Sequence, residues 1–142
     1  MIKVEKSVVI KKPVEEVFVY SQSIDNLTKW AGMSMQMLEG SGNVVGSRFL
    51  STRTFLGKEM KVTMEVTAFK ENELWAAKSI EGPVQSKISI TYAKVPEGTK
   101  VTMAGEGETK GFFKLAEGAV ASSMGKSLEE SLNLLKSILE GA

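Results

Sequence analysis

The sequence predicts an α+β domain in which an antiparallel sheet packs against one long C-terminal helix. Three observations lead to this prediction. Residues 112–140 repeat apolar side chains at helical spacing, residues 33–108 alternate apolar and polar side chains in short segments, and two short helical patterns stand between residues 13 and 32. Because short turn signals separate the alternating segments, consecutive strands are expected to pair as an antiparallel meander. The 142 residues fit a single domain, 1–142.

The first strand is expected over residues 4–10, where apolar and polar side chains alternate. Pro13 suits the first position of a helix, and Glu15 and Glu16 stand where the helix dipole favours acidic side chains. A short helix is therefore predicted over residues 13–20.

Ser23 is a suitable N-cap for a second short helix. Helical spacing predicts that Ile24, Leu27 and Trp30 point inward from it. Gly32 is expected to end this helix.

The meander is expected to begin at Met33, because Met33, Met35 and Met37 share one face of an extended strand. Residues 74–80 fit two registers, and the pattern does not decide whether Trp75 lies in the interior. The cleanest alternation places five apolar residues of one strand inward: Met60, Val62, Met64, Val66 and Ala68.

The last two strands also present one apolar face each. Ile88, Ile90 and Tyr92 oppose polar side chains, and the final strand has two glycines, Gly105 and Gly107, on the face that carries Val101 and Met103. These glycines leave space where side chains would otherwise stand.

The long helix has one apolar face whose residues change in size along its length. The small residues lie in the N-terminal half, so a pocket between the sheet and this half is predicted. The residues assigned to the buried face are Phe113, Ala116, Val120, Met124, Leu128, Leu134, Leu135 and Ile138.

The composition excludes several kinds of chemistry. A net charge of +1 offers little electrostatic attraction for nucleic acid, and the absence of cysteine and histidine removes thiolate nucleophiles, imidazole bases and the commonest metal ligands. We therefore expect no metal centre, no cofactor and no nucleic-acid partner. The N-terminal residues lack the order of a signal peptide and no apolar run is long enough for a membrane span, so a soluble cytoplasmic protein is expected.

Four segments stand in a recognisable order before the terminal helix: KPVEEVF at 12–18, IDNLTKW at 24–30, VGSRF at 45–49 and GTKVT at 98–102. Together with that helix they resemble the polyketide cyclase/dehydrase branch of the START-like (SRPBCC) superfamily over essentially the whole chain. Ser23 stands where these proteins often have Asp and Thr28 where they often have Pro, which is cap and turn variation.

The resemblance implies a helix-grip fold of the Bet v and START-like type. In this fold a curved seven-stranded antiparallel sheet wraps around a long C-terminal helix, two short helices lie between strands 1 and 2, and a hydrophobic cavity is enclosed. The superfamily includes lipid carriers, hormone- and allergen-type binding proteins, polyketide cyclases, oxygenase domains and chaperone-ATPase activators. A chain without histidine cannot supply the iron ligands of the oxygenase branch. Fold alone does not choose among the others.

Methionine and aromatic side chains on the inward faces are the candidates for ligand binding, because flexible, polarizable methionines suit surfaces that accept varied apolar molecules. Alternatively, they simply fill the core, and Phe112 and Phe113 form either a portal or a staple that fixes the start of the helix. The candidates are Trp30, Met33, Met35, Met37, Phe49, Met60, Met64, Trp75, Tyr92, Met103, Phe112, Phe113, Ala116, Val120 and Met124.

Glu117, Arg53 and Tyr92 are the candidates for moving a proton. Glu117 lies on the apolar stripe of the helix, where burial would raise the pKa of its carboxyl, although a solvated or Lys114-paired Glu117 is the alternative. Arg53 shares strand parity with Phe49 and would point inward, to pair with Glu117 or an acidic ligand, unless a bulge turns it outward.

The leading hypothesis is binding or carriage of a hydrophobic molecule, lipid-like or aromatic, between sheet and helix. An enzyme of the cyclase or dehydratase kind, working without metal in the same pocket, is the alternative. A cofactor-delivery or complex-assembly factor is a third class, which would display a large exposed apolar patch.

Overall fold

The computed structural model describes residues 2–41, 44–55, 57–81, 85–108 and 117–141. Their order of elements agrees with the prediction. In chain order they form β1 (Ile2–Ile10), α1 (Val14–Gln22), the 3-10 helix η1 (Ile24–Asn26), α2 (Leu27–Trp30), β2 (Ser34–Glu39), β3 (Arg48–Phe55), β4 (Lys58–Lys70), β5 (Leu74–Glu81), β6 (Gln85–Val95), β7 (Gly98–Glu108) and α4 (Glu117–Glu140).

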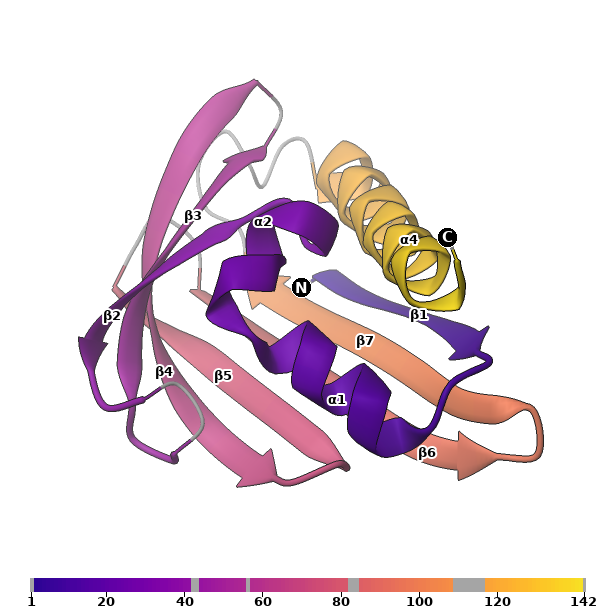
Figure 1. Cartoon of the computed structure of the whole chain (residues 1–142). Helices are drawn as coiled ribbons and strands as arrows, with labels where there is room; N and C mark the ends of the chain where they lie inside the picture. The colour runs from indigo at the N-terminus through magenta and orange to yellow at the C-terminus, as the bar shows by residue number, and fades with distance from the viewer. Residues whose placement is uncertain (1, 42–43, 56, 82–84, 109–116, 142) are drawn as a thin grey trace.

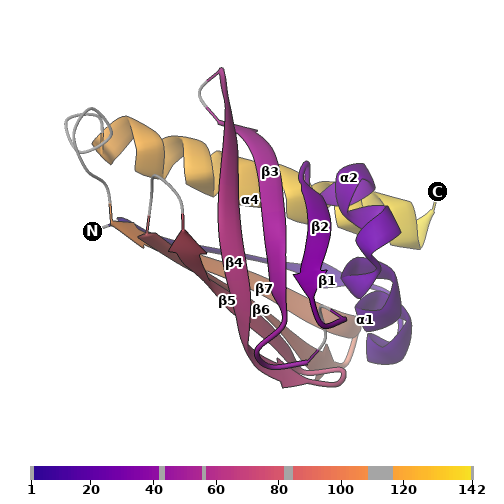
Figure 2. The same cartoon turned by 90° about the vertical axis from the view of Figure 1, so that its left-hand side faces the viewer.

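The strands pair as one antiparallel seven-stranded sheet in the order β1-β7-β6-β5-β4-β3-β2, so β1 and β2 form its edges. Figure 1 shows α4 on one side of this sheet and α1 beside β6 and β7. In Figure 2, β2, β3 and β4 rise steeply from the plane of β1, β7 and β6. The sheet therefore curves around α4, which packs chiefly against β1 and also contacts α2.

The sequence around Pro13 accounts for the start of α1. Pro13 occupies the N-cap position with an extended backbone, and two acidic residues lie in the first turn of the helix. The helix continues two residues past the predicted end, to Gln22. Its buried face consists of Val14, Val17, Phe18 and Ser21.

The second helical segment differs in detail from the prediction. Ser23 occupies the N-cap position of η1, but its side chain makes no capping hydrogen bond. Ile24 is 36% exposed and is not part of the buried core, but it lines the cavity described below, so its side chain does face the interior. Leu27 and Trp30 are buried as predicted, and Gly32 has a φ of 64° where the chain leaves α2.

The buried face of α4 consists of Val120, Gly125, Leu128, Leu132 and Leu135. The assignment of Leu134 to this face is wrong, because Leu134 is 46% exposed. Six residues at about 100° each place Leu134 about 240° around the helix from Leu128, whereas Leu132 lies one turn away on the same face. No helix in the described part of the chain is long and apolar enough to cross a bilayer.

A β-bulge reverses the alternation at the end of β4. The β4–β5 register shifts between Val66 and Ala68, and Phe69 then stands opposite Trp75. The predicted inward position of Ala68 is therefore wrong, and Phe69 takes the inner face, where its ring lies 5.8 Å from that of Phe18. Trp75 is only 5% exposed, so the register that the pattern left open places Trp75 in the interior.

One end of the interior is tightly packed, and we call it the closed end. At its rim, Lys136 Nζ donates to the Val9 carbonyl oxygen at 2.7 Å, and the Lys11 backbone N–H donates to Glu140 at 2.9 Å. These bonds hold the C-terminal end of α4 to the end of β1. The closed end comprises Ile10, Val17, Tyr92, Val101, Leu132 and Leu135, each at most 5% exposed.

Candidate ligand-binding cavity

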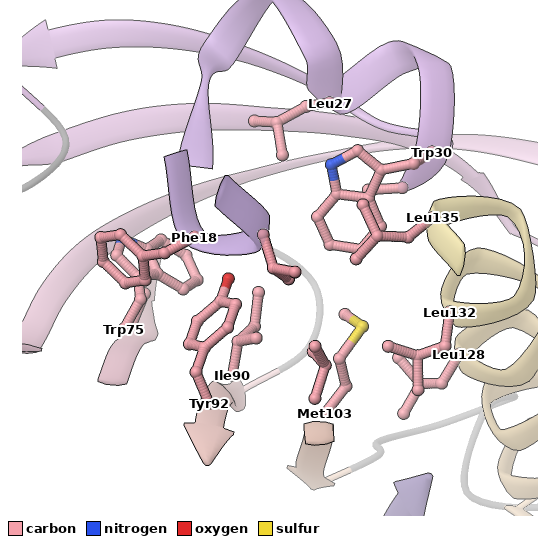
Figure 3. Close-up of a cluster of buried hydrophobic side chains, with 14 of the residues drawn as sticks. Phe18, Leu27, Trp30, Trp75, Ile90, Tyr92, Met103, Leu128, Leu132 and Leu135 are labelled. Carbon is pink, nitrogen blue, oxygen red and sulfur yellow. The ribbon is translucent and has the colours of Figure 1, made fainter. Parts of the chain in front are cut away.

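A cavity of about 610 Å³ lies between the concave face of the sheet, α2 and the N-terminal half of α4. Figure 3 shows Trp30, Met103 and Leu128 pointing from α2, β7 and α4 toward a common space, and all three line the cavity. Most of the sequence-derived candidates also line it: Trp30, Met33, Met35, Phe49, Arg53, Met60, Met64, Trp75, Met103, Val120 and Met124.

Three candidates with a described position do not line this cavity. Met37 packs, half-buried, against the hydrophobic core instead. Tyr92 belongs to the closed end, and Glu117 is partly exposed at the first position of α4. Phe112, Phe113 and Ala116, together with the portal suggested for the first two, lie outside the described residues.

The Tyr92 hydroxyl takes part in a buried hydrogen-bond network. Its oxygen lies 2.6 Å from Ser21 Oγ and accepts from Gln22 Nε2 at 3.0 Å, while Ser21 Oγ donates to the Phe18 carbonyl oxygen. Burial raises the pKa of the Tyr92 phenol, and the hydrogen bonds of Ser21 and Gln22 oppose that rise. Tyr92 thus ties β6 to α1 and is committed to that structural contact.

Small residues on β7 leave room for the cavity. Gly105 and Gly107 both line it, on the inner face that the alternation predicts. A Cβ at Gly105 would lie 3.5 Å from Met124 Cε and 3.6 Å from Val4 Cγ2, which is ordinary contact distance. A side chain larger than alanine at this position would therefore extend into the cavity.

Arg53 brings a charge into these apolar surroundings. The β3–β4 register runs without a shift from Arg48 to Phe55, so Arg53 keeps the inward parity and pairs with Met60 across the strands. Its Nη2 lies 3.3 Å from Met33 Sδ, and burial lowers the pKa of the guanidinium. An arginine nevertheless stays protonated in proteins. Among the described residues, no carboxylate forms an ion pair with Arg53.

Trp30 contributes a second polar hydrogen. The side chain is 1% exposed and lines the cavity, and within the described part of the chain its Nε1–H has no hydrogen-bond acceptor. Burial of an N–H donor without an acceptor costs about 1–3 kcal/mol. An oxygen atom of a ligand would remove that cost.

Sequence reasoning missed several lining residues. Phe69 was missed because the bulge in β4 reverses its parity, and an isolated strand pattern carries no signal for such a shift. Ile88 and Ile90 also line the cavity, from the inner face of β6 that the alternation predicts, and are absent from the candidates for ligand binding. Across the described residues, Asp and Glu form no cluster suited to a metal ion.

Comparison with known proteins gives one family. Residues 1–140 match the family model described as polyketide cyclase / dehydrase and lipid transport. No curated protein sequence matches the chain significantly.

Solved structures of similar fold cover almost the whole chain. A protein from Thermus thermophilus has a TM-score of 0.81 at 19% identity, with 94% of each chain covered. A START superfamily protein from Mycobacterium smegmatis has a TM-score of 0.81 at 15% identity, with 97% of each covered. Ara h 8.0201 has a TM-score of 0.72 at 15% identity, with 96% of each covered. At these identities the likeness establishes the fold, and the predicted helix-grip fold is confirmed.

Proposed function

The chain belongs to the polyketide cyclase/dehydrase and lipid transport family, and from that premise we propose that its cavity binds a hydrophobic small molecule, lipid-like or aromatic. The observation that carries the proposal is the cavity itself. Its volume of about 610 Å³ falls within the range of roughly 300–1,000 Å³ typical of small-molecule sites. Apolar side chains from both sheet and helix form most of its wall.

The methionines favour a ligand of adaptable shape over one rigid outline. Met33, Met35, Met60 and Met124 line the cavity and are only partly buried, so each side chain can change rotamer without breaking a tight core. Their sulfur atoms also suit contact with aromatic rings. We therefore propose a site that holds its ligand by fit and burial.

Binding is better supported than catalysis. A cyclase or dehydratase needs a group that moves a proton in the pocket. Of the three candidates, Tyr92 and Glu117 do not line the cavity, and Arg53 holds its proton too firmly to serve as a general base. Of these three candidates, Arg53 is the one left to assist a cyclisation in this cavity, which would then depend mainly on positioning of the substrate.

The proposal is tested with a neutral fluorescent probe, the methyl ester of dansylated undecanoic acid. We expect its emission to increase on saturable binding to the purified protein. Gly105→Leu should abolish this binding, because the added side chain extends from β7 into the cavity. Gly118→Leu adds the same side chain at an exposed position of α4, where a Cβ would have no described atom within 4 Å, and should bind as the wild type does.

Native mass spectrometry followed by denaturation gives a second readout. A small molecule of defined mass, released on unfolding of the wild type and absent from Gly105→Leu, would identify the ligand class. Lack of saturable probe binding, or equal binding by both leucine variants, would overturn the proposed function.

A further inference from the structure

Arg53 is a cation that lines a largely apolar cavity and has no anionic partner among the described residues. Resting on the proposed function, we propose that the ligand carries a carboxylate that pairs with the Arg53 guanidinium, so that the site takes an apolar acid. The apolar body of the ligand would then lie along the other lining methionines, Met35, Met60 and Met124. Its acidic end would lie beside Met33, which directly precedes β2.

The contacts of Arg53 motivate this assignment. Among the described residues, its side chain donates to the Met33 thioether at 3.3 Å, and a thioether is a weak acceptor that brings no compensating charge. Arg48, five residues earlier on the same strand, lies on the outside and has Glu39 at 3.8 Å and Glu65 at 4.0 Å. A charge removed from water needs an ionic partner. The protein provides carboxylates for the outer residue, Arg48, and among the described residues none for the inner residue, Arg53.

No acidic side chain in the described part of the protein forms an ion pair with Arg53. Every Asp and Glu of the sequence lies within the described residues, and none of them pairs with it. Two acidic residues do contact the cavity. Asp25 is exposed on η1, and Glu106 pairs with Lys3 at 3.7 Å. The missing anion is therefore expected to arrive with the ligand.

A second donor supports an oxygen-bearing group on the ligand. Trp30 lines the same cavity as Arg53, and its buried Nε1–H lacks an acceptor among the described residues. A carboxylate has two oxygens and the guanidinium offers a planar fork of N–H donors that matches them. A single cation balances a carboxylate, whereas a phosphate monoester would retain uncompensated charge.

The experiment compares dansylated undecanoic acid with its methyl ester at about pH 8, where the carboxyl group is ionised. We expect the acid to bind the wild type about 10- to 100-fold more tightly than the ester, the advantage of a hydrogen-bonded charge pair. Arg53→Met should remove that preference by weakening the acid and leaving the ester unchanged or tighter. Arg53→Lys keeps the charge without the fork and should retain part of the preference.

Arg48→Met is the matched control, because it removes the same charge from the same strand outside the cavity. It should preserve the preference for the acid. Equal binding of acid and ester by the wild type, or a preference that survives in Arg53→Met, would overturn the carboxylate assignment and leave the proposed function standing. Failure of both probes to bind would overturn the two together.

Competition with dodecanoate and dodecyl phosphate separates the two kinds of anion. We expect dodecanoate to displace the dansylated acid more effectively from the wild type, with the difference lost in Arg53→Met. An Arg53-dependent advantage for dodecyl phosphate would overturn the choice of carboxylate. Thermal unfolding of each variant without ligand shows whether a loss of binding is a loss of folding.

Discussion

The two ends of the sheet–helix interior are built from the same elements but filled in different ways. At the closed end, Leu132 and Leu135 of α4 are at most 1% exposed. Toward the other end of the same helix, Met124 is partly exposed and lines a cavity. We call the second region the cavity end. The side chains that distinguish it are the partly exposed lining residues Met33, Met35, Met60, Val62 and Met124.

The difference shows how one fold separates stability from binding. The closed end is filled by buried apolar side chains, and their burial favours folding whether or not the cavity is occupied. Because this contribution does not depend on the cavity, the cavity end can stay incompletely filled. The two ends should therefore respond differently to substitutions of the same kind.

The largest contrast is expected from truncation of one side chain at each end. Leu132→Ala should lower the free energy of unfolding by about 3 kcal/mol, because it leaves a void in a core that cannot collapse fully. Met124→Ala should cost less than about 1.5 kcal/mol, since Met124 already borders empty space. Urea unfolding of both variants measures the difference. Equal losses would contradict a division of the interior into two ends.

Two glycines of β7 make a second contrast. Gly98 has a φ of +147°, and a Cβ there would overlap the Ile10 carbonyl oxygen, so Gly98→Ala should destabilise the protein by about 2 kcal/mol. Gly105→Ala meets only ordinary contacts and restricts the unfolded chain, so it should stabilise by about 0.5 kcal/mol. Thermal unfolding checks both signs. A destabilising Gly105→Ala would show that the space beside β7 is not available.

The smallest expected effect concerns the Tyr92 hydroxyl. Tyr92→Phe should lower the free energy of unfolding by about 1 kcal/mol through loss of the contacts with Ser21 and Gln22, and probe binding should be unchanged. Tyr20→Phe, at the only other tyrosine, is the control and should have less effect on stability.

The same residue gives a pH dependence. Burial raises the pKa of the folded-state phenol above the unfolded value of about 10. The neutral phenol is then favoured in the folded protein. Its contribution to the free energy of unfolding is fully present below about pH 10 and is lost as the pH rises through the folded-state pKa. Between about pH 9 and 11 the wild type should lose more stability than Tyr92→Phe. Parallel pH curves for the two proteins would contradict this.

Most of the fold could be predicted from periodicity, because each amphipathic segment reveals the face that it buries. The order of strands and helices, the inner face of β7 and the inward parity of Arg53 all followed from local patterns. The resemblance to the START-like superfamily added the curvature of the sheet, which no single strand encodes.

The remaining details depend on tertiary contacts. The bulge that brings Phe69 inward arises from pairing between β4 and β5, and the pattern of β4 alone continues through Ala68 without interruption. Tyr92 does not line the cavity, because its hydroxyl is hydrogen-bonded to Ser21 and Gln22 of α1. Similarly, alternation placed Arg53 inward, but only the assembled sheet shows that Met33 is its neighbour.

The cavity wall includes both tryptophans of the chain, Trp30 and Trp75, each at most 5% exposed. All tryptophan emission of this protein therefore originates beside the cavity. An incoming molecule that changes the polarity around either indole would shift or quench the natural fluorescence without any attached label. Because Trp30 stands on α2 and Trp75 on β5, replacing one at a time with phenylalanine gives two separate optical signals, one from each wall. The chain thus carries a built-in reporter of occupancy.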